Sequence, residues 1–94
     1  MKLDTIGVIG AGVMGSGVAQ VSAAAGYFAV VQDTDDSALE RAKSGIESSM
    51  KKLVEKGKFS EKDLEAAMGR IQYTKELEKA CQDADLVVEA VFED

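Results

Sequence analysis

The feature that most constrains the fold of this chain is a glycine-rich turn between an apolar run and a helical pattern. Residues 6–9, IGVI, are rich in β-branched side chains and predict a short buried strand. Gly10, Gly12 and Gly15 follow with the spacing G-x-G-x-x-G. In such a turn the first glycine permits a tight bend and the third lets the helix pack closely on the strand. The chain is therefore expected to begin as strand, turn and helix.

A helix and a second strand complete the first unit of the fold. Gly26 stands where a left-handed residue ends many helices, and residues 27–33, YFAVVQD, predict a strand. The apolar side chains expected on the buried face of the helix are Met14, Val18, Val21 and Ala25. Strand, helix and strand make a βαβ unit, in which we expect parallel strands and a right-handed crossover.

A helical hairpin is predicted next. Ser37 and Glu40 have capping-box spacing, with Asp35 as a competing N-cap, and Gly57 ends the first helix. Its buried face is marked by an apolar stripe at helical spacing: Leu39, Ala42, Ile46, Met50 and Leu53.

The second helix of the hairpin lies between a cap-like pair, Ser60 and Asp63, and a stop at Gly69. Three more elements follow: a strand at 70–74 (RIQYT), a short helix at 75–81 and a strand at 84–91 (ADLVVEAV). The last strand is nearly all apolar, which is typical of a strand in a buried parallel sheet.

These elements predict the α/β fold class. We expect a Rossmann-type parallel sheet of four strands in the order β-α-β-αα-β-α-β, with the helical hairpin inserted between the second and third strands. In the doubly wound order the first and fourth strands are neighbours, so the outer edge of the fourth strand would be open. An open apolar edge pairs readily with another chain, which predicts self-association.

Composition excludes several classes of function. The net charge of −6 argues against a nucleic-acid partner, because phosphate backbones are bound through clustered Lys and Arg. Cys81 is the single cysteine, so no internal disulfide forms, and a cytoplasmic location is expected. The chain has no histidine, which excludes a histidine base or ligand among these residues. Gly, Ser and Gln interrupt the apolar N-terminus, so it predicts neither a signal peptide nor a membrane span.

The glycine turn and the residue that ends the second strand together predict a dinucleotide site. Gly12 would leave room for a pyrophosphate, and the helix N-terminus would supply N–H groups to it. Asp33 would accept hydrogen bonds from the adenosine ribose and repel a 2′-phosphate, which favours NAD over NADP. Two alternatives stay open: a glycine turn without a dinucleotide, and Asp33 as a strand-end or capping carboxylate near Asp35 and Asp36.

Longer stretches carry a resemblance to a known family. The stretches GVIGAGVMGSGVAQVSAAAGY, QDTD, KKLVEKGKFSEKDLEAAMGRIQYT and DADLVVEAVFED resemble the N-terminal NAD-binding domain of the 3-hydroxyacyl-CoA dehydrogenases, which include bacterial 3-hydroxybutyryl-CoA dehydrogenases. The glycine motif is shared with many dehydrogenases, whereas the hairpin combined with VVEAVFED is more specific. The resemblance implies NAD-dependent interconversion of 3-hydroxyacyl-CoA and 3-ketoacyl-CoA, in fatty-acid or butanoate metabolism.

The resemblance also implies residue roles. The NAD-binding residues would be Gly10, Gly12, Val13, Met14, Gly15, Gly17, Asp33, Ala90 and Glu93. Ser49 and Lys56 on the hairpin match positions at which the family contacts coenzyme A. Read without the resemblance, Lys56 is one of several solvated lysines.

None of the 94 residues is assigned a catalytic role. The family's catalytic histidine, its orienting glutamate, a later Ser and Asn, and the helical C-terminal domain would all lie after the point at which this chain ends. We therefore expect residues 1–94 to be an incomplete NAD-binding domain that is inactive alone. The alternatives are a free-standing, non-catalytic nucleotide-binding module and, less favoured because it lacks the hairpin, a dehydrogenase of the 3-hydroxyisobutyrate or 6-phosphogluconate type.

Overall fold

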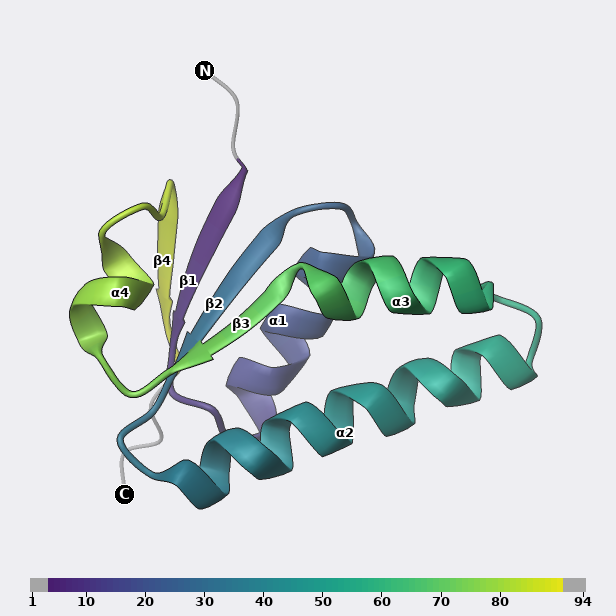
Figure 1. The fold of residues 1–94 in the computed structure, drawn as a ribbon, viewed down its shortest axis with the longest axis horizontal. Helices are drawn as coiled ribbons and strands as arrows, with labels where there is room; N and C mark the ends of the chain where they lie inside the picture. Colours follow the sequence, from purple (N-terminus) through teal and green to yellow (C-terminus); the bar gives the residue numbers. More distant parts are fainter. Residues whose placement is uncertain (1–3, 91–94) are drawn as a thin grey trace.

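The computed structural model describes residues 4–90, which form one parallel sheet with helices against it (Figure 1). The elements in chain order are β1 (Thr5–Ile9), α1 (Val13–Ala24), β2 (Phe28–Gln32), α2 (Asp36–Glu55), α3 (Glu61–Gly69), β3 (Ile71–Thr74), α4 (Leu77–Cys81) and β4 (Leu86–Glu89). The strand order is β3-β2-β1-β4, and every pair is parallel. The predicted α/β fold class is confirmed.

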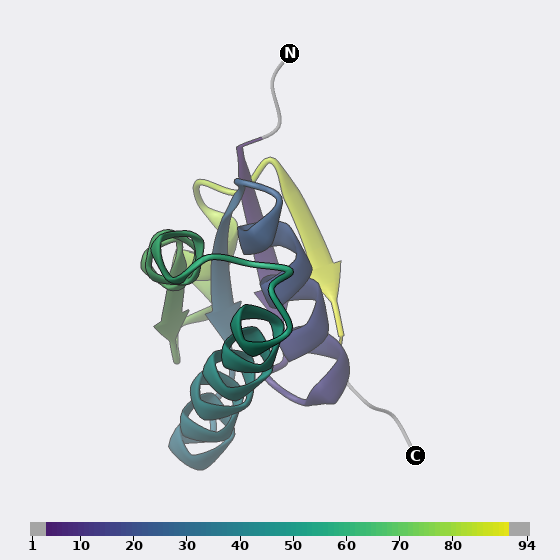
Figure 2. The same ribbon diagram turned by 90° about the vertical axis from the view of Figure 1, so that its right-hand side faces the viewer.

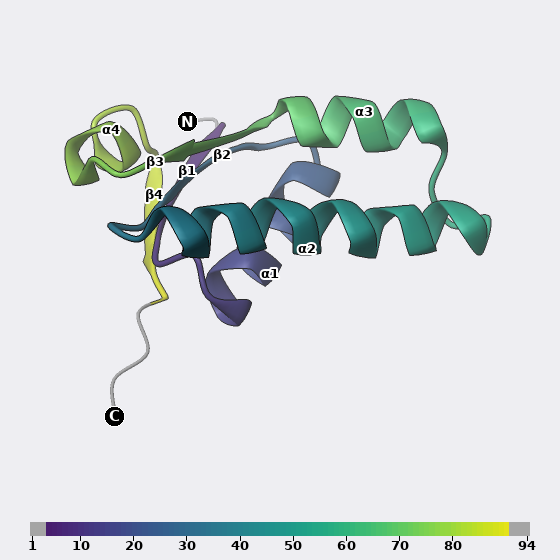
Figure 3. The ribbon, with the colours of Figure 1, turned by 60° about the horizontal axis from the view of Figure 1, so that its bottom comes forward.

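Helices cover both faces of the sheet. Side chains of neighbouring strand residues point to opposite faces, so Gly7 and Val8 of β1 face opposite sides of the sheet. A Cβ on Gly7 would meet the Ala80 carbonyl of α4, whereas a Cβ on Gly15 of α1 would lie 3.3 Å from the Val8 side chain. Thus α4 packs on one face and α1 on the other, with α2 and α3 packed against α1. Figure 3 shows α2 and α3 as an antiparallel hairpin.

The buried face of α1 differs from the sequence prediction. Met14 and Val21 are exposed, Ala25 lies past the helix end, and Val18 is partly buried. The buried residues are the small ones: Gly15, Ala19, Ser22 and Ala23. The prediction was wrong because α1 lies too close to the sheet for long side chains, so hydrophobicity did not select the packed face.

The hairpin follows the predicted pattern, with one correction at its start. Asp35 is the N-cap of α2, accepting from the Ser37 N–H at 2.9 Å, so the Ser37–Glu40 capping box was wrong. Ser60 and Asp63 do form the reciprocal capping box of α3. The predicted stripe of α2 is confirmed at Ala42, Ile46 and Met50, with Leu39 and Leu53 partly buried.

The fourth strand is shorter and more exposed than predicted. It spans Leu86–Glu89, and it pairs with β1 at the edge of the described sheet (Figure 2). Leu86 and Val87 are 48% and 44% exposed, so the predicted burial was wrong for these two residues, whereas Val88 is partly buried and Ala90 is buried. Residue 91, the end of the predicted strand, lies outside the described residues.

The closeness of α1 to its own turn gives a test of the fold. A Cβ on Gly15 would overlap the Gly10 carbonyl oxygen, whereas one on Gly17, in the same helix, would meet no atom within 4 Å. We expect Gly15→Ala to lower the free energy of unfolding by about 1–3 kcal/mol, the typical cost of overpacking. The control Gly17→Ala should raise it by about 0.4–1 kcal/mol. Urea unfolding followed by circular dichroism measures both, and equal effects would contradict the close contact.

Candidate functional site

The glycine turn follows β1 at the carboxyl edge of the sheet. Gly10 has a φ of 105°, a left-handed conformation that favours glycine, and its N–H donates to the Gln32 carbonyl at 2.7 Å. Gly12 is the N-cap of α1, and a Cβ there would meet no atom within 4 Å. The turn therefore bends tightly against the end of β2 and leaves open space beside Gly12.

The N-terminus of α1 has the character of an anion site. Among the described residues no side chain caps it, and its first turn carries no acidic residue. Helices α2 and α3 differ, because Asp35 and Ser60 cap them and acidic residues occupy their first turns. The free N–H groups and partial positive charge of an uncapped helix start suit a phosphate. The residues around the turn therefore fit a pyrophosphate.

Asp33 joins the end of β2 to this turn. Its Oδ2 accepts from the Ala11 N–H at 3.0 Å, and its Oδ1 accepts from the Asp35 N–H at 3.0 Å. These backbone N–H groups, Ala11 first, hold the pKa of Asp33 below its ordinary value of 3.8, against the opposing effect of partial burial. A carboxylate has about four acceptor positions, so an ionised Asp33 keeps acceptor capacity for hydroxyl groups.

The structure brings together most of the predicted cofactor residues. Val13 and Met14 are exposed on the first turn of α1, Gly15 is buried beneath it, and Gly17 is exposed one turn further on. The Ala90 N–H donates to the Ile9 carbonyl at 2.8 Å, which places Ala90 beside the glycine turn. Glu93 lies outside the described residues.

The two residues assigned to coenzyme A lie on the hairpin, away from the glycine turn. Ser49 is half-buried, and its hydroxyl oxygen accepts from Gln20 Nε2 of α1 at 2.9 Å. Lys56 is the exposed C-cap residue of α2, about two helical turns further on. Lys52 shares this side of the helix with them, so the face is basic.

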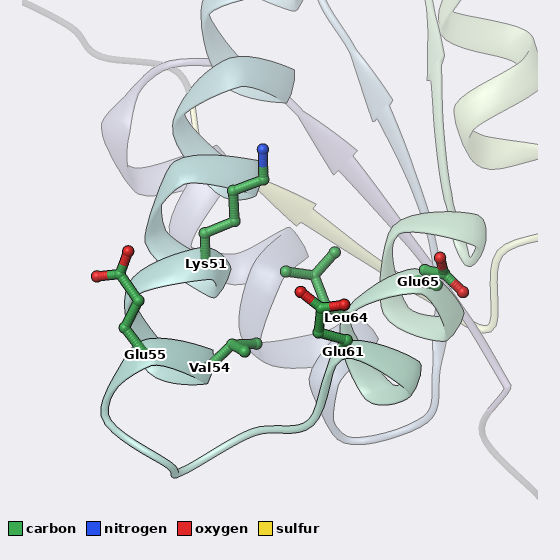
Figure 4. A pocket seen from close by; sticks show the side chains of 6 residues that line it. All are labelled: Lys51, Val54, Glu55, Glu61, Leu64 and Glu65. Carbon is green, nitrogen blue, oxygen red and sulfur yellow. The ribbon is translucent and has the colours of Figure 1, made fainter.

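A pocket of about 280 Å³ lies elsewhere, between α2 and α3 (Figure 4). Its lining residues are Lys51, Val54, Glu55, Glu61, Leu64 and Glu65. Figure 4 shows Val54 and Leu64 between the two helices, among the three glutamates. On α2, Lys51 and Glu55 project about half a turn of the helix away from Ser49. Three carboxylates against one ammonium disfavour a phosphate, so this pocket is not part of the coenzyme A assignment.

Two residues of the site were missed by the sequence analysis. Ala11 supplies the N–H that binds Asp33, but a backbone donor leaves no signal in residue type. Gln32 is buried, and its Nε2 donates to the Lys75 carbonyl at 3.1 Å. A polar residue at the end of an apolar strand was the available signal for Gln32.

Residues 4–90 contain no group of three His, Cys, Asp or Glu side chains suited to a metal ion. No helix within that range is long and apolar enough to span a bilayer.

The fold, the uncapped helix and Asp33 define the chain as a Rossmann-type dinucleotide-binding domain. Residues 5–94 match the family model described as 3-hydroxyacyl-CoA dehydrogenase, NAD binding domain. The chain therefore belongs to this family, as its NAD-binding domain, and NAD is the cofactor that this family membership implies.

Individual relatives agree with the family. The chain is 49% identical, over 93% of its length, to a probable 3-hydroxybutyryl-CoA dehydrogenase of Deinococcus radiodurans. It superposes on the crystal structure of FadB2 from M. tuberculosis with a TM-score of 0.94 and 36% identity, covering 100% of this chain and 33% of that one. For the (S)-3-hydroxybutyryl-CoA dehydrogenase of Ralstonia eutropha the TM-score is 0.93, with 33% identity and coverage of 99% and 32%. The chain spans about a third of these relatives, 31% for the Deinococcus protein.

The hydrogen bonds to Asp33 predict an acid-sensitive contribution to stability. The folded-state pKa lies below 3.8, so the contribution is present above the unfolded value and is lost as the pH falls through the folded value. We expect the stability difference between wild type and Asp33→Asn to be constant near neutral pH and to shrink below about pH 4. Urea unfolding at a series of pH values measures it.

The control for this experiment is Asp83→Asn, which changes an exposed carboxylate after α4. A difference between wild type and Asp33→Asn that persists unchanged down to pH 2.5 would contradict the assigned hydrogen bonds.

Proposed function

We propose that the N-terminus of α1 and Asp33 form the adenosine and pyrophosphate part of an NAD(H) site. The observation that carries the proposal is the uncapped start of α1, hydrogen-bonded through Ala11 to an ionised carboxylate at the end of β2. The backbone of Gly12, Val13 and Met14 would bind the pyrophosphate, with Gly10 shaping the turn, and Asp33 would accept from the ribose hydroxyls. Gly15 lets α1 approach, and Gly17 leaves the helix surface open.

The proposal extends to the activity of the protein that carries this domain. We propose that it interconverts 3-hydroxyacyl-CoA and 3-ketoacyl-CoA, with NAD(H) accepting or supplying the hydride. Support comes from family membership and from relatives described as 3-hydroxybutyryl-CoA dehydrogenases. Ala90 and Glu93 would line the cofactor site after β4. A cytoplasmic location belongs to the same proposal, and cell fractionation tests it.

A non-catalytic nucleotide-binding module is the second candidate. The 94 residues contain no histidine for proton transfer, which is compatible with both candidates and does not separate them. An assay of acetoacetyl-CoA reduction by NADH, run on the protein that carries this domain, separates the two, because a module binds NADH without turnover. That these residues alone are inactive stays a prediction.

Cofactor preference tests the role of Asp33. Removing charge-assisted hydrogen bonds costs about 1.5–3 kcal/mol, so Asp33→Ala should weaken NADH binding about tenfold to a hundredfold. Wild type should bind NADH more tightly than NADPH, because the carboxylate repels a 2′-phosphate. Fluorescence titration measures both affinities, with Asp83→Ala as a control for the lost charge. Equal affinity of wild type for the two cofactors would remove Asp33 from the site.

The basic face of α2 is proposed to contact coenzyme A through Ser49 and Lys56. An exposed ion pair is worth about 0.2–1 kcal/mol, so the double change Ser49→Ala, Lys56→Ala should weaken acetoacetyl-CoA binding by up to about fivefold. NADH binding should not change. The matched control is Ser44→Ala, Lys51→Ala, the same residue types at the same spacing on the other side of α2. Calorimetric titration measures the affinities, and equal losses in the two double variants would contradict the assignment.

Self-association through β4 is also part of the proposal. Leu86 and Val87 expose apolar surface, and β4 hydrogen-bonds to β1 alone among the described strands. We expect light scattering to find a dimer or larger species, and Val87→Lys to shift it toward monomer. Val21→Lys, on the exposed side of α1, is the control. A monomer at all concentrations would contradict self-association through the edge of β4.

A further inference from the structure

The loop after β3 lies beside Asp33 at the carboxyl edge of the sheet. Gln32 pairs with Thr74 in the parallel register, and the Asp33 N–H donates to the Thr74 carbonyl at 3.1 Å. Lys75 therefore follows β3 as Asp33 follows β2. The buried Gln32 fixes this arrangement, because its Nε2 donates to the Lys75 carbonyl at 3.1 Å.

The side chain of Lys75 reaches back over this edge to α2. Its Nζ lies 3.3 Å from Oδ2 of Asp36, the first residue of α2, and both side chains are more than half exposed. Asp33 and Asp35 both accept backbone N–H groups, whereas Asp36 is paired with Lys75. The ammonium of Lys75 is thus paired with Asp36, and its backbone follows the residue that accepts from the Asp33 N–H.

A second cation also acts on this region. Arg41, exposed on α2, lowers the pKa of Asp33 through its charge. Arg41 differs from Lys75 because it lies in the second turn of α2. Its backbone therefore does not share the hydrogen bond of Gln32 or the pairing of β2 with β3. Lys75 and Arg41 are therefore two candidates among the described residues for a positive group near a 2′-phosphate.

We propose that Lys75 is a second determinant of cofactor selectivity, withheld from a 2′-phosphate by its ion pair with Asp36. The inference rests on the proposed adenosine site at Asp33. In this arrangement Asp33 repels the 2′-phosphate directly. Asp36 acts indirectly, because its ion pair with Lys75 keeps the Lys75 ammonium from attracting the 2′-phosphate. Releasing Lys75 then raises affinity for NADPH and has little effect on NADH, which has no 2′-phosphate.

A double-mutant cycle tests the coupling with NADH and NADPH as the probes. Asp36→Asn should raise NADPH affinity about two- to fivefold, the size of an exposed ion pair, beyond any change for NADH. Adding Lys75→Gln to Asp36→Asn should abolish that gain, whereas adding Arg41→Gln should preserve most of it. High salt should reduce the gain, because exposed charges are screened.

The charge controls are Asp83→Asn and Lys79→Gln, which change exposed residues outside this edge, and circular dichroism checks folding. A gain in NADPH affinity that is equal with and without Lys75 would overturn the proposal, since loss of the acidic charge alone would explain it. A gain that needs Arg41 instead would overturn it as well. If wild type does not bind NADH, the proposed adenosine site fails; if NADH binds but the cycle shows no coupling, only the role of Lys75 fails.

Discussion

The close approach of α1 to its own turn is the contact on which the rest of the site depends. Gly15 sits so near the Gly10 carbonyl that any side chain would clash, so the helix starts directly behind β1. Its first N–H groups are thereby presented at the carboxyl edge of the sheet, where the strands also end. A longer or displaced turn would move the helix start away from Asp33, and the Ala11 N–H would lose its acceptor.

Parallel register then gathers the functional loops. The carboxyl ends of parallel strands meet at one edge, so the loops after β1, β2, β3 and β4 are neighbours there. Hydrogen bonds join each loop to the next: Gly10 to Gln32, Asp33 to Thr74, and Ala90 to Ile9. Asp33 therefore has a structural role in addition to its proposed cofactor role. A carboxylate that ends the strand and a carboxylate that accepts from a ribose are compatible roles for this one residue.

The sequence predicted the order of elements because each local signal was strong. The glycines at 26 and 57 adopt the left-handed conformation that their positions required, and Ser60 caps α3 as its spacing indicated. The buried face of α1 was not predictable from hydrophobicity, since the contact selects for small size and places Met14 and Val21 outside. The Lys75–Asp36 ion pair joins residues far apart in the chain, so no local pattern could reveal it.

The acidity of the whole chain and the anion site at α1 are compatible because the two act over different distances. The net charge is −6, yet a helix terminus acts within its first turn and exposed charges are screened over about 10 Å. The distribution of acids follows this logic: the first turns of α2 and α3 and the cap of α2 carry them, whereas the first turn of α1 has none. Carboxylates at α2 and α3 stabilise those helix starts locally. The same carboxylates at α1 would neutralise the N–H groups that a pyrophosphate requires, so the uncapped start of this helix supports the proposed pyrophosphate site.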